Sequence, residues 1–231
     1  ARVGVHCYSS KDLYNWKDEG IALKVDPKEG SKLEIGCIIE RPKVIYNART
    51  RKYVMWFHYE QKGHGYDRAA SGVALSAKAT GPFKLLKIFR PDAGTWPLNV
   101  LSMHKSTPFN AMGAKFNGGY CSNDVDSVNF VKRDFEWGQM ARDMNLFVDT
   151  DGKAYLIYSS EENSTLHISL LTPDYLSTSG KWVRVFPGKH NEGAALFKRK
   201  GKYYLFTSAC TGWAPNPGRS AMASHIFGPW T

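Results

Sequence analysis

Short apolar runs separated by polar turns follow one another along most of the chain. Three segments repeat one pattern: a carboxylate, an apolar run, a polar turn, and a second run that is rich in aromatic residues and begins with lysine. These segments are residues 40–57, 143–158 and 192–206. Two β-prone runs joined by turn residues predict a β-hairpin in each segment.

Each predicted hairpin is followed by further strand-like runs. They lie at residues 72–76 and 81–86, at 165–170 and 181–186, and at 219–224 and 228–230. Residues 4–9 and 15–23 look like the same outer pair without its hairpin, and no stretch has sustained helical periodicity. The repeating unit is therefore four short antiparallel strands, which predicts an all-β protein of the β-propeller class with about three and a half blades visible.

The expected domain organisation is a single, incomplete propeller over residues 1–231. An open sandwich of similar strands is the alternative. Residues 91–138 break the pattern, because they are rich in proline and glycine and carry few apolar alternations. We interpret them as a long inserted loop, and we expect the chain to be a fragment of a longer ring.

Composition narrows the class of protein further. Aromatic residues reach 13%, which suits an all-β core and a site that stacks flat ligands. No apolar run approaches the roughly 20 residues that span a bilayer. The net charge of +10 indicates a basic surface, but no nucleic-acid-binding module signature accompanies it. The four cysteines lack metal-type spacing, so we expect no structural zinc; whether they pair is open.

The carboxylates that open the three repeats are the candidate chemistry. Glu40, Asp143 and Glu192 hold the same place ahead of the first strand of a unit. In a propeller that strand lines the channel, so we expect the three acids to converge on one pocket. Crowded carboxylates raise the pKa of at least one member. One acid that keeps its proton beside others that stay charged is the equipment for cleaving a glycosidic bond.

Nearby aromatic residues offer faces on which a sugar ring can stack. The candidates are Trp56, Tyr66 and Trp213. By contrast, we interpret the Glu161–Glu162 pair as a solvated strand end, with the alternative that Glu161 reaches the rim of the channel.

The motifs in these repeats resemble glycoside hydrolase family 43, and in particular its branch of exo-acting galactan 1,3-β-galactosidases. The resemblance covers most of residues 4–90 and 138–231. It is carried by residues 40–43, 142–147, 151–161, 190–192 and 210–216. It implies a five-bladed β-propeller that inverts the anomeric carbon of an oligo- or polysaccharide, in a secreted or periplasmic protein.

The resemblance also implies roles for individual residues. Glu192 matches the general acid, Asp143 the acid that tunes it and orients the substrate, and Glu40 a substrate-contacting acid. Further sugar contacts are implied at Tyr66, Asn163 and Trp213. The remaining substrate-binding candidates are Arg41, Trp56, Arg142 and Thr211.

The sequence departs from the family at two points. The segment that carries the usual aspartate base is absent, so the catalytic base cannot be named. Gly193 and Ala194 stand where Ala-Pro is usual, which is expected to loosen the entry of that strand. The family's channel sometimes holds a structural Ca²⁺, and no residue here specifies one; we expect no other cofactor. The alternatives are α-L-arabinofuranosidase, β-galactofuranosidase and a carbohydrate-binding propeller without turnover.

Overall fold

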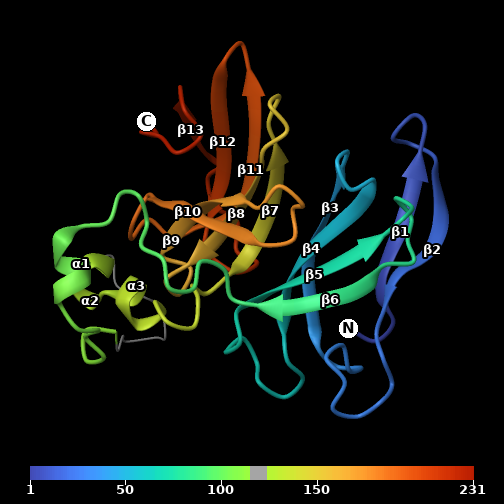
Figure 1. Cartoon of the computed structure of the whole chain (residues 1–231), viewed down its shortest axis with the longest axis horizontal. Coiled ribbons are helices and arrows are strands. Elements are labelled where there is room, and N and C mark those ends of the chain that lie inside the picture. Colours follow the sequence, from blue (N-terminus) through green and yellow to red (C-terminus); the bar gives the residue numbers. More distant parts are fainter. Residues whose placement is uncertain (115–123) are drawn as a thin grey trace. The chain divides into compact units, whose positions relative to one another are not determined.

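The computed structural model describes residues 1–114 and 124–231. The chain divides into two compact units, unit 1 (Ala1–Phe89) and unit 2 (Arg90–Thr231). All sheets within them are antiparallel, and each joins strands that follow one another in sequence (Figure 1). Among the described residues, no helix is both long enough and apolar enough to cross a membrane.

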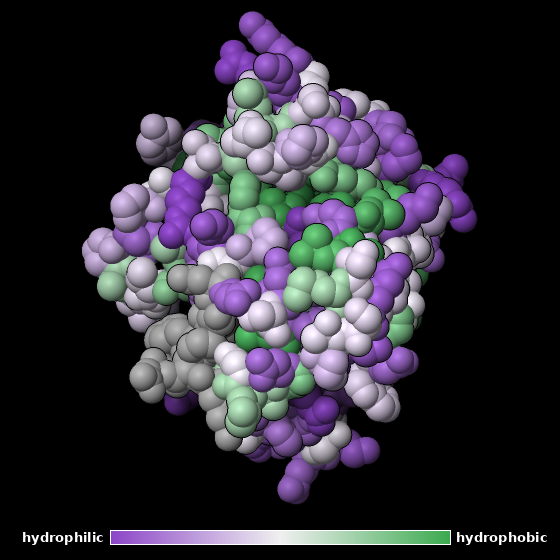
Figure 2. All heavy atoms as spheres, turned by 90° about the vertical axis from the view of Figure 1, so that its left-hand side faces the viewer, coloured by the Kyte–Doolittle hydropathy of each residue, from purple (hydrophilic) through white to green (hydrophobic). Residues whose placement is uncertain are grey.

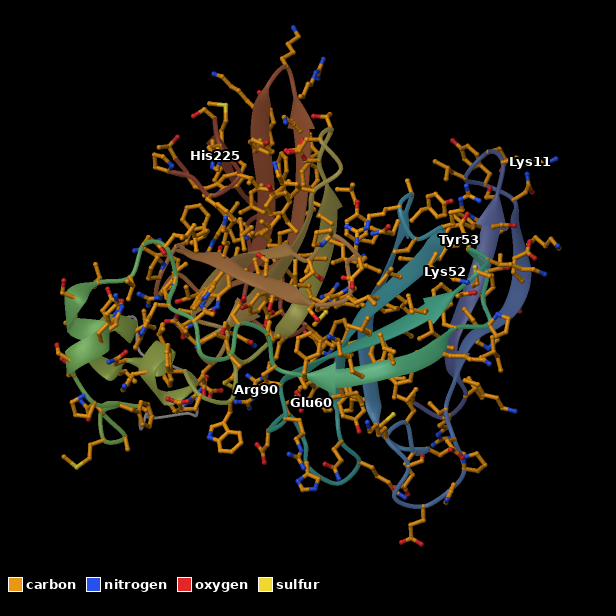
Figure 3. The ribbon with its side chains drawn as sticks, in the orientation of Figure 1. Lys11, Lys52, Tyr53, Glu60, Arg90 and His225 are labelled. Atoms are coloured by element: carbon orange, nitrogen blue, oxygen red, sulfur yellow. The ribbon has the colours of Figure 1, made fainter. Side chains whose placement is uncertain are left out.

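Unit 1 contains two sheets. The smaller pairs β1 (Gly4–Ser10) with β2 (Trp16–Lys24), and the larger is a meander of β3 (Ile38–Asn47), β4 (Lys52–Glu60), β5 (Ala70–Ser76) and β6 (Lys84–Phe89). Apolar residues of β2 pack against one face of β4 and β5, as Leu23, Phe57 and Ala74 show. Figure 3 shows Lys52 and Tyr53 at the start of β4, next to the β3–β4 turn, and Glu60 at the other end of the strand.

Unit 2 contains a four-stranded and a three-stranded sheet. The first is β7 (Arg142–Val148), β8 (Ala154–Ser160), β9 (Thr165–Leu171) and β10 (Thr178–Val185), and the second is β11 (Asn191–Arg199), β12 (Lys202–Ala209) and β13 (Arg219–Ala223). Their facing sides share a core that includes Ile157, Ile168 and Leu205. The backbone of Thr231 exchanges two hydrogen bonds with Met222 of β13, which is where a fourth strand is predicted.

The inserted segment that follows β6 and precedes β7 in the sequence is partly helical. It contains α1 (Ser102–Ser106), α2 (Val125–Val128) and α3 (Phe130–Arg133), each too short to leave a helical period in the sequence. Asn99 attaches the segment to the outer edge of β10, because its side chain both donates to the Arg184 carbonyl and accepts from the Arg184 amide. The segment is therefore joined to the sheet rather than simply looped out from it.

The predicted repeat is confirmed for the three hairpins and for three of the four outer pairs, but the strand predicted at residues 228–230 is not formed, and the last sheet has three strands. The three hairpins correspond to β3–β4, β7–β8 and β11–β12, and the outer pairs to β1–β2, β5–β6 and β9–β10. On the face of unit 2 drawn in Figure 2, hydrophobic residues gather in a band that hydrophilic side chains surround. That the whole of residues 1–231 acts as one domain stays a prediction.

Candidate active site

Each hairpin begins with a bulge, and the candidate acids lie at these bulges. Pairing in the first strand skips two residues, between Glu40 and Lys43, between Arg142 and Asn145, and between Glu192 and Ala195. In this register, Glu40, Arg142 and Glu192 occupy equivalent positions in the three repeats, because each is the last paired residue before the bulge. Asp143 lies one residue further on, inside its bulge. The prediction that all three acids are equivalent is therefore wrong for Asp143, because each bulge leaves two residues unpaired and Asp143 is the first of these two, whereas Glu40 and Glu192 are the last paired residues before their bulges.

Asp143 and the Glu192 bulge meet within unit 2. The two inner strands β7 and β11 lie side by side, with Asn145 donating its side-chain N–H to the Ala194 carbonyl at 2.8 Å. Asp143 has a left-handed backbone (φ 40°), a conformation that Asp tolerates better than most residues. Its carboxylate accepts a hydrogen bond from the Gly193 amide. The bulge of one sheet therefore holds the acid of the other.

Gly193 suits this arrangement. Its φ is 62°, in the left-handed region that glycine enters without steric cost. Gly193 stands at the alanine position of the family's Ala-Pro pair, and alanine also carries a backbone N–H. The departure at this residue therefore changes its conformational freedom and keeps the N–H that donates to Asp143.

Glu192 is hydrogen-bonded to a side chain from the turn between β8 and β9. Asn163 donates its side-chain N–H to Glu192 Oε1 at 3.1 Å. The turn carries three consecutive left-handed residues, Glu161, Glu162 and Asn163, with φ between 51° and 62°. Such a run costs free energy and persists only where neighbouring contacts hold it. Sequence analysis placed Asn163 among the sugar contacts, and the structure shows it hydrogen-bonded to the candidate general acid.

Cys210 is a neighbour of the same carboxylates. It is half-buried just beyond the end of β12, and its thiol donates to the Asn163 carbonyl at 3.5 Å. Burial, the charge and hydrogen bonding of Glu192, and the charge of Asp143 together raise the pKa of the Cys210 thiol to about 12. The thiol therefore stays neutral beside the two acids at physiological pH.

Glu161 anchors the turn that carries Asn163. Its carboxylate is fully buried and accepts hydrogen bonds from Arg184 at 2.6 and 2.7 Å, from His167 at 2.9 Å and from Thr165 at 3.1 Å. Burial acts to raise the pKa of Glu161, but the charge of Arg184 and the hydrogen bond with His167 outweigh it and lower the pKa to about 2. The interpretation of Glu161 as a solvated strand end is therefore wrong.

The remaining candidates of unit 2 differ in how the structure engages them. Arg142 forms an ion pair with Glu162 at 3.4 Å, and Glu162 also binds Arg133 at 2.8 Å. The Thr211 hydroxyl donates to the Ala214 carbonyl within its own loop. Trp213, on the same loop, is fully exposed and presents a free ring face.

Glu40 in unit 1 is held from two sides. Tyr66 donates its hydroxyl hydrogen to Glu40 Oε1 at 2.8 Å, and His58 Nδ1 lies 3.1 Å from Glu40 Oε2. The other ring nitrogen of His58 lies 2.7 Å from Glu60, which is completely buried. The hydrogen bonds from His58 and Tyr66 outweigh partial burial and lower the pKa of the Glu40 carboxyl, so Glu40 is ionised at neutral pH.

Two other candidates in unit 1 have contrasting surroundings. Arg41 is exposed in the β3 bulge with a φ of 52°. Trp56 has no exposed surface and makes an edge contact with Phe89. The prediction of Trp56 as a sugar-stacking face is wrong, because no part of its ring is exposed to a ligand.

Sequence reasoning missed His58, Glu60 and Cys210. Alignment of the second strands of the repeats would have identified Glu60 and Cys210. Like Glu161, each stands two residues beyond the residue that pairs with the last position before the bulge. Of the cysteines, Cys7, Cys37 and Cys210 are free thiols, and Cys121 lies outside the described residues. Across residues 1–114 and 124–231, no group of three or more His, Cys, Asp or Glu is arranged to hold a metal.

Comparisons with known proteins agree on one class. The family model described as "Glycosyl hydrolases family 43" matches residues 123–231. The structure of the β-1,3-galactosidase BT3683 with galactodeoxynojirimycin is 50% identical, with a TM-score of 0.93, and the match covers 100% of this chain and 67% of that one. No curated protein matches the chain.

More distant structures point the same way. An exo-β-1,3-galactanase from Clostridium thermocellum is 37% identical (TM-score 0.75) over 99% of this chain and 41% of that one. An exo-β-1,3-galactanase from Phanerochaete chrysosporium with β-1,3-galactotriose is 28% identical (TM-score 0.72) over 100% of this chain and 43% of its own. The chain thus spans two thirds of the first protein and less than half of the other two.

These matches define the class of fold: the chain is an all-β protein whose sheets are blades of a five-bladed β-propeller. The chain belongs to glycoside hydrolase family 43.

Proposed function

We propose that the native protein carrying this chain is an exo-acting, inverting β-1,3-galactosidase. The observation that carries the proposal is 50% identity over the whole chain to a β-1,3-galactosidase solved with galactodeoxynojirimycin. The galactanase from Phanerochaete chrysosporium, solved with β-1,3-galactotriose, supports the same substrate class.

Glu192 is proposed as the general acid. An inverting glycosidase protonates the leaving glycosidic oxygen with one carboxylic acid, while a base takes a proton from the water that attacks the anomeric carbon from the opposite face. Asn163 fixes one oxygen of Glu192 at 3.1 Å. Asp143, bound to the adjacent Gly193 amide, places a negative charge beside Glu192, which favours retention of its proton.

Glu40 is proposed as a substrate contact supplied by unit 1. An ionised carboxylate accepts hydrogen bonds from sugar hydroxyls and does not donate them. The lowered pKa of the Glu40 carboxyl fits such an acceptor role. Tyr66 and Trp213 are both exposed aromatics, and we assign them to contacts with the sugar.

The decisive experiment is the Glu192→Gln variant of the native protein, assayed by galactose release from β-1,3-galactan. We expect a loss of about a hundredfold or more, the usual scale for a general acid. Glu136→Gln is the matched control, because Glu136 is an exposed carboxylate in the same unit. An unchanged rate in Glu192→Gln would show that the acid is misassigned.

A panel of aryl glycosides tests the sugar. β-Galactopyranoside should be the preferred substrate, and preference for α-L-arabinofuranoside or β-galactofuranoside would replace the proposed specificity with that of another family member. Galactotriose binding without product after long incubation would instead indicate a binding propeller without turnover.

We also propose a secreted or periplasmic location, because a polysaccharide does not cross a membrane to reach an enzyme inside the cell. Fractionation of the native host tests this, and exclusive recovery from the cytoplasm would contradict it.

A further inference from the structure

His58 sits between two carboxylates in the interior of unit 1. Its side chain is 1% exposed, with Nδ1 3.1 Å from Glu40 and Nε2 2.7 Å from Glu60. Glu40 comes from β3, whereas His58 and Glu60 are two residues apart in β4 and therefore on the same face of that strand. The three side chains form a line from the half-exposed Glu40 to the fully buried Glu60.

This geometry favours a doubly protonated imidazole between two carboxylates. A neutral histidine has one N–H donor and one bare nitrogen, which would face a carboxylate lone pair without a proton between them. With both nitrogens protonated, each donates to a carboxylate, and the charges alternate along the line. Burial acts to lower the pKa of His58, but the hydrogen bonds to Glu40 and Glu60 outweigh it and raise the pKa.

Glu60 also fixes the loop that follows β4. Both of its carboxylate oxygens accept from the amide of Ala69, at 3.0 and 2.9 Å. Ala69 has a left-handed backbone, with φ 41°, at the point where the loop enters β5. The same loop carries Tyr66, whose hydroxyl reaches the other oxygen of Glu40. Glu60 thus acts on Glu40 along two routes, through His58 and through the loop.

We propose that His58 and Glu60 are positioning residues for Glu40, which hold its carboxylate charged and aimed at the sugar subsite. The inference rests on the proposed function only in taking Glu40 as a sugar contact. Neither His58 nor Glu60 touches the substrate, since both are buried behind Glu40.

The first experiment measures β-1,3-galactotriose binding by calorimetry in the native protein with the Glu192→Gln background, which prevents turnover. His58→Gln should weaken binding about tenfold or more, since it removes a charged hydrogen bond to Glu40. His64→Gln is the matched control, because His64 lies exposed in the loop after β4, and its affinity should equal that of the background.

A double-variant cycle separates positioning from general damage. If His58 acts through Glu40, then His58→Gln combined with Glu40→Gln should bind no more weakly than Glu40→Gln alone. Losses that simply add would overturn the proposal, as would normal affinity in His58→Gln.

The pH dependence of binding gives a second readout. The titratable groups that face His58 within unit 1 are Glu40 from β3, Glu60 from β4 and Tyr66 from the following loop. Affinity should fall at alkaline pH as His58 loses its second proton. Glu60→Gln removes one stabilising charge, so this fall should begin about one pH unit lower. The same onset in both proteins would overturn the role of Glu60.

The outcomes distinguish the two proposals. A protein that neither binds galactotriose nor releases galactose refutes the proposed function. A protein that does both, but is indifferent to His58→Gln, refutes only the positioning role.

Discussion

The second strand of each hairpin has an equivalent position near its end, two residues beyond the partner of Glu40 or Glu192, and the two units carry different residues there. In unit 1, His58 faces Glu40 across the ladder, and β4 ends two residues later at the buried Glu60. In unit 2, the position two residues beyond the partner of Glu192 is Cys210. One sheet therefore ends on a buried carboxylate and another on a neutral thiol, although both positions lie beside a candidate catalytic or substrate-binding acid.

The sheet β7–β10 shows what a buried carboxylate at this position requires. Glu161 occupies it, with Arg184, His167 and Thr165 all donating to its oxygens. A charge taken out of water is tolerated only with such partners. The Glu60 carboxylate is satisfied in the same way, by His58 and a backbone amide.

A neutral side chain at Cys210 suits its position beside Glu192 and Asp143. Glu192 must carry a proton to act as a general acid, and Asp143 already places one negative charge near it. Arg219 acts on Cys210 through its charge, but its guanidinium already donates to the Lys189 carbonyl and the Asn191 side chain. A thiol with a pKa of about 12 fills the space without adding charge. In the mechanism proposed above, the buried charge of Glu60 thus lies behind the acid that stays ionised, and the neutral thiol lies beside the acid that exchanges a proton.

The largest effect is expected where this position carries charge. Glu161→Gln leaves the Arg184 guanidinium, whose side chain is 3% exposed, short of its main partner, so the free energy of unfolding should fall by about 3–5 kcal/mol. Denaturant unfolding measures it. Glu162→Gln, at a neighbouring carboxylate that is 31% exposed, should cost under about 1 kcal/mol. Equal losses in the two variants would contradict the role given to burial.

A charge introduced at the thiol position should change the reaction. Cys210→Asp adds a negative charge beside Glu192, which makes loss of the acid's proton harder. The alkaline limb of the kcat/KM profile should therefore move upward by about one pH unit. Cys210→Ser, which is neutral and similar in size, should leave the limb in place. A shift in both variants would mean that packing, and not charge, matters here.

The sequence predicted the repeat well because a strand's period of two is a local property. Hairpins and outer strand pairs were expected within a few residues of their observed bounds. Glu40 and Glu192 were also placed correctly at equivalent positions. Asp143 was misplaced by one because the three hairpin turns differ in length, so counting back from the turn does not give the register of the first strand.

Burial was the part that local patterns could not predict. Glu161 is buried because Arg184 lies opposite it, 23 positions later in the chain. His58 reads as an ordinary strand residue until Glu40, 18 positions earlier, is known to touch it. Trp56 was misjudged for the same reason, since its exposure depends on what covers the sheet.

A smaller effect is expected from the Glu192 bulge itself. Gly193→Ala keeps the N–H that Asp143 accepts, but forces a side chain into a left-handed backbone with φ 62°. The added Cβ would meet only Ser208 Oγ, at 3.4 Å, so the cost is conformational, about 1 kcal/mol. Gly218→Ala is the control, because nothing lies within 4 Å of its added Cβ. Thermal unfolding of both variants measures the difference, and equal stability would contradict the strain argument.

The smallest expected effect is on the pH dependence of stability, to which His58 and His167 contribute in opposite directions. The folded-state pKa of His58 is raised above its ordinary 6.5, since its carboxylate partners outweigh burial. Its contribution to stability is therefore complete below about pH 6.5 and is lost as pH rises through the folded pKa. The pKa of His167 is lowered, by burial first, so protonation opposes folding and stability falls as pH drops below about 6.5. His58→Gln should flatten the alkaline side of the stability profile, and His167→Gln the acidic side. Denaturant unfolding from pH 5 to 9 measures both, and the reverse pattern would show that the two imidazoles are in the opposite protonation states.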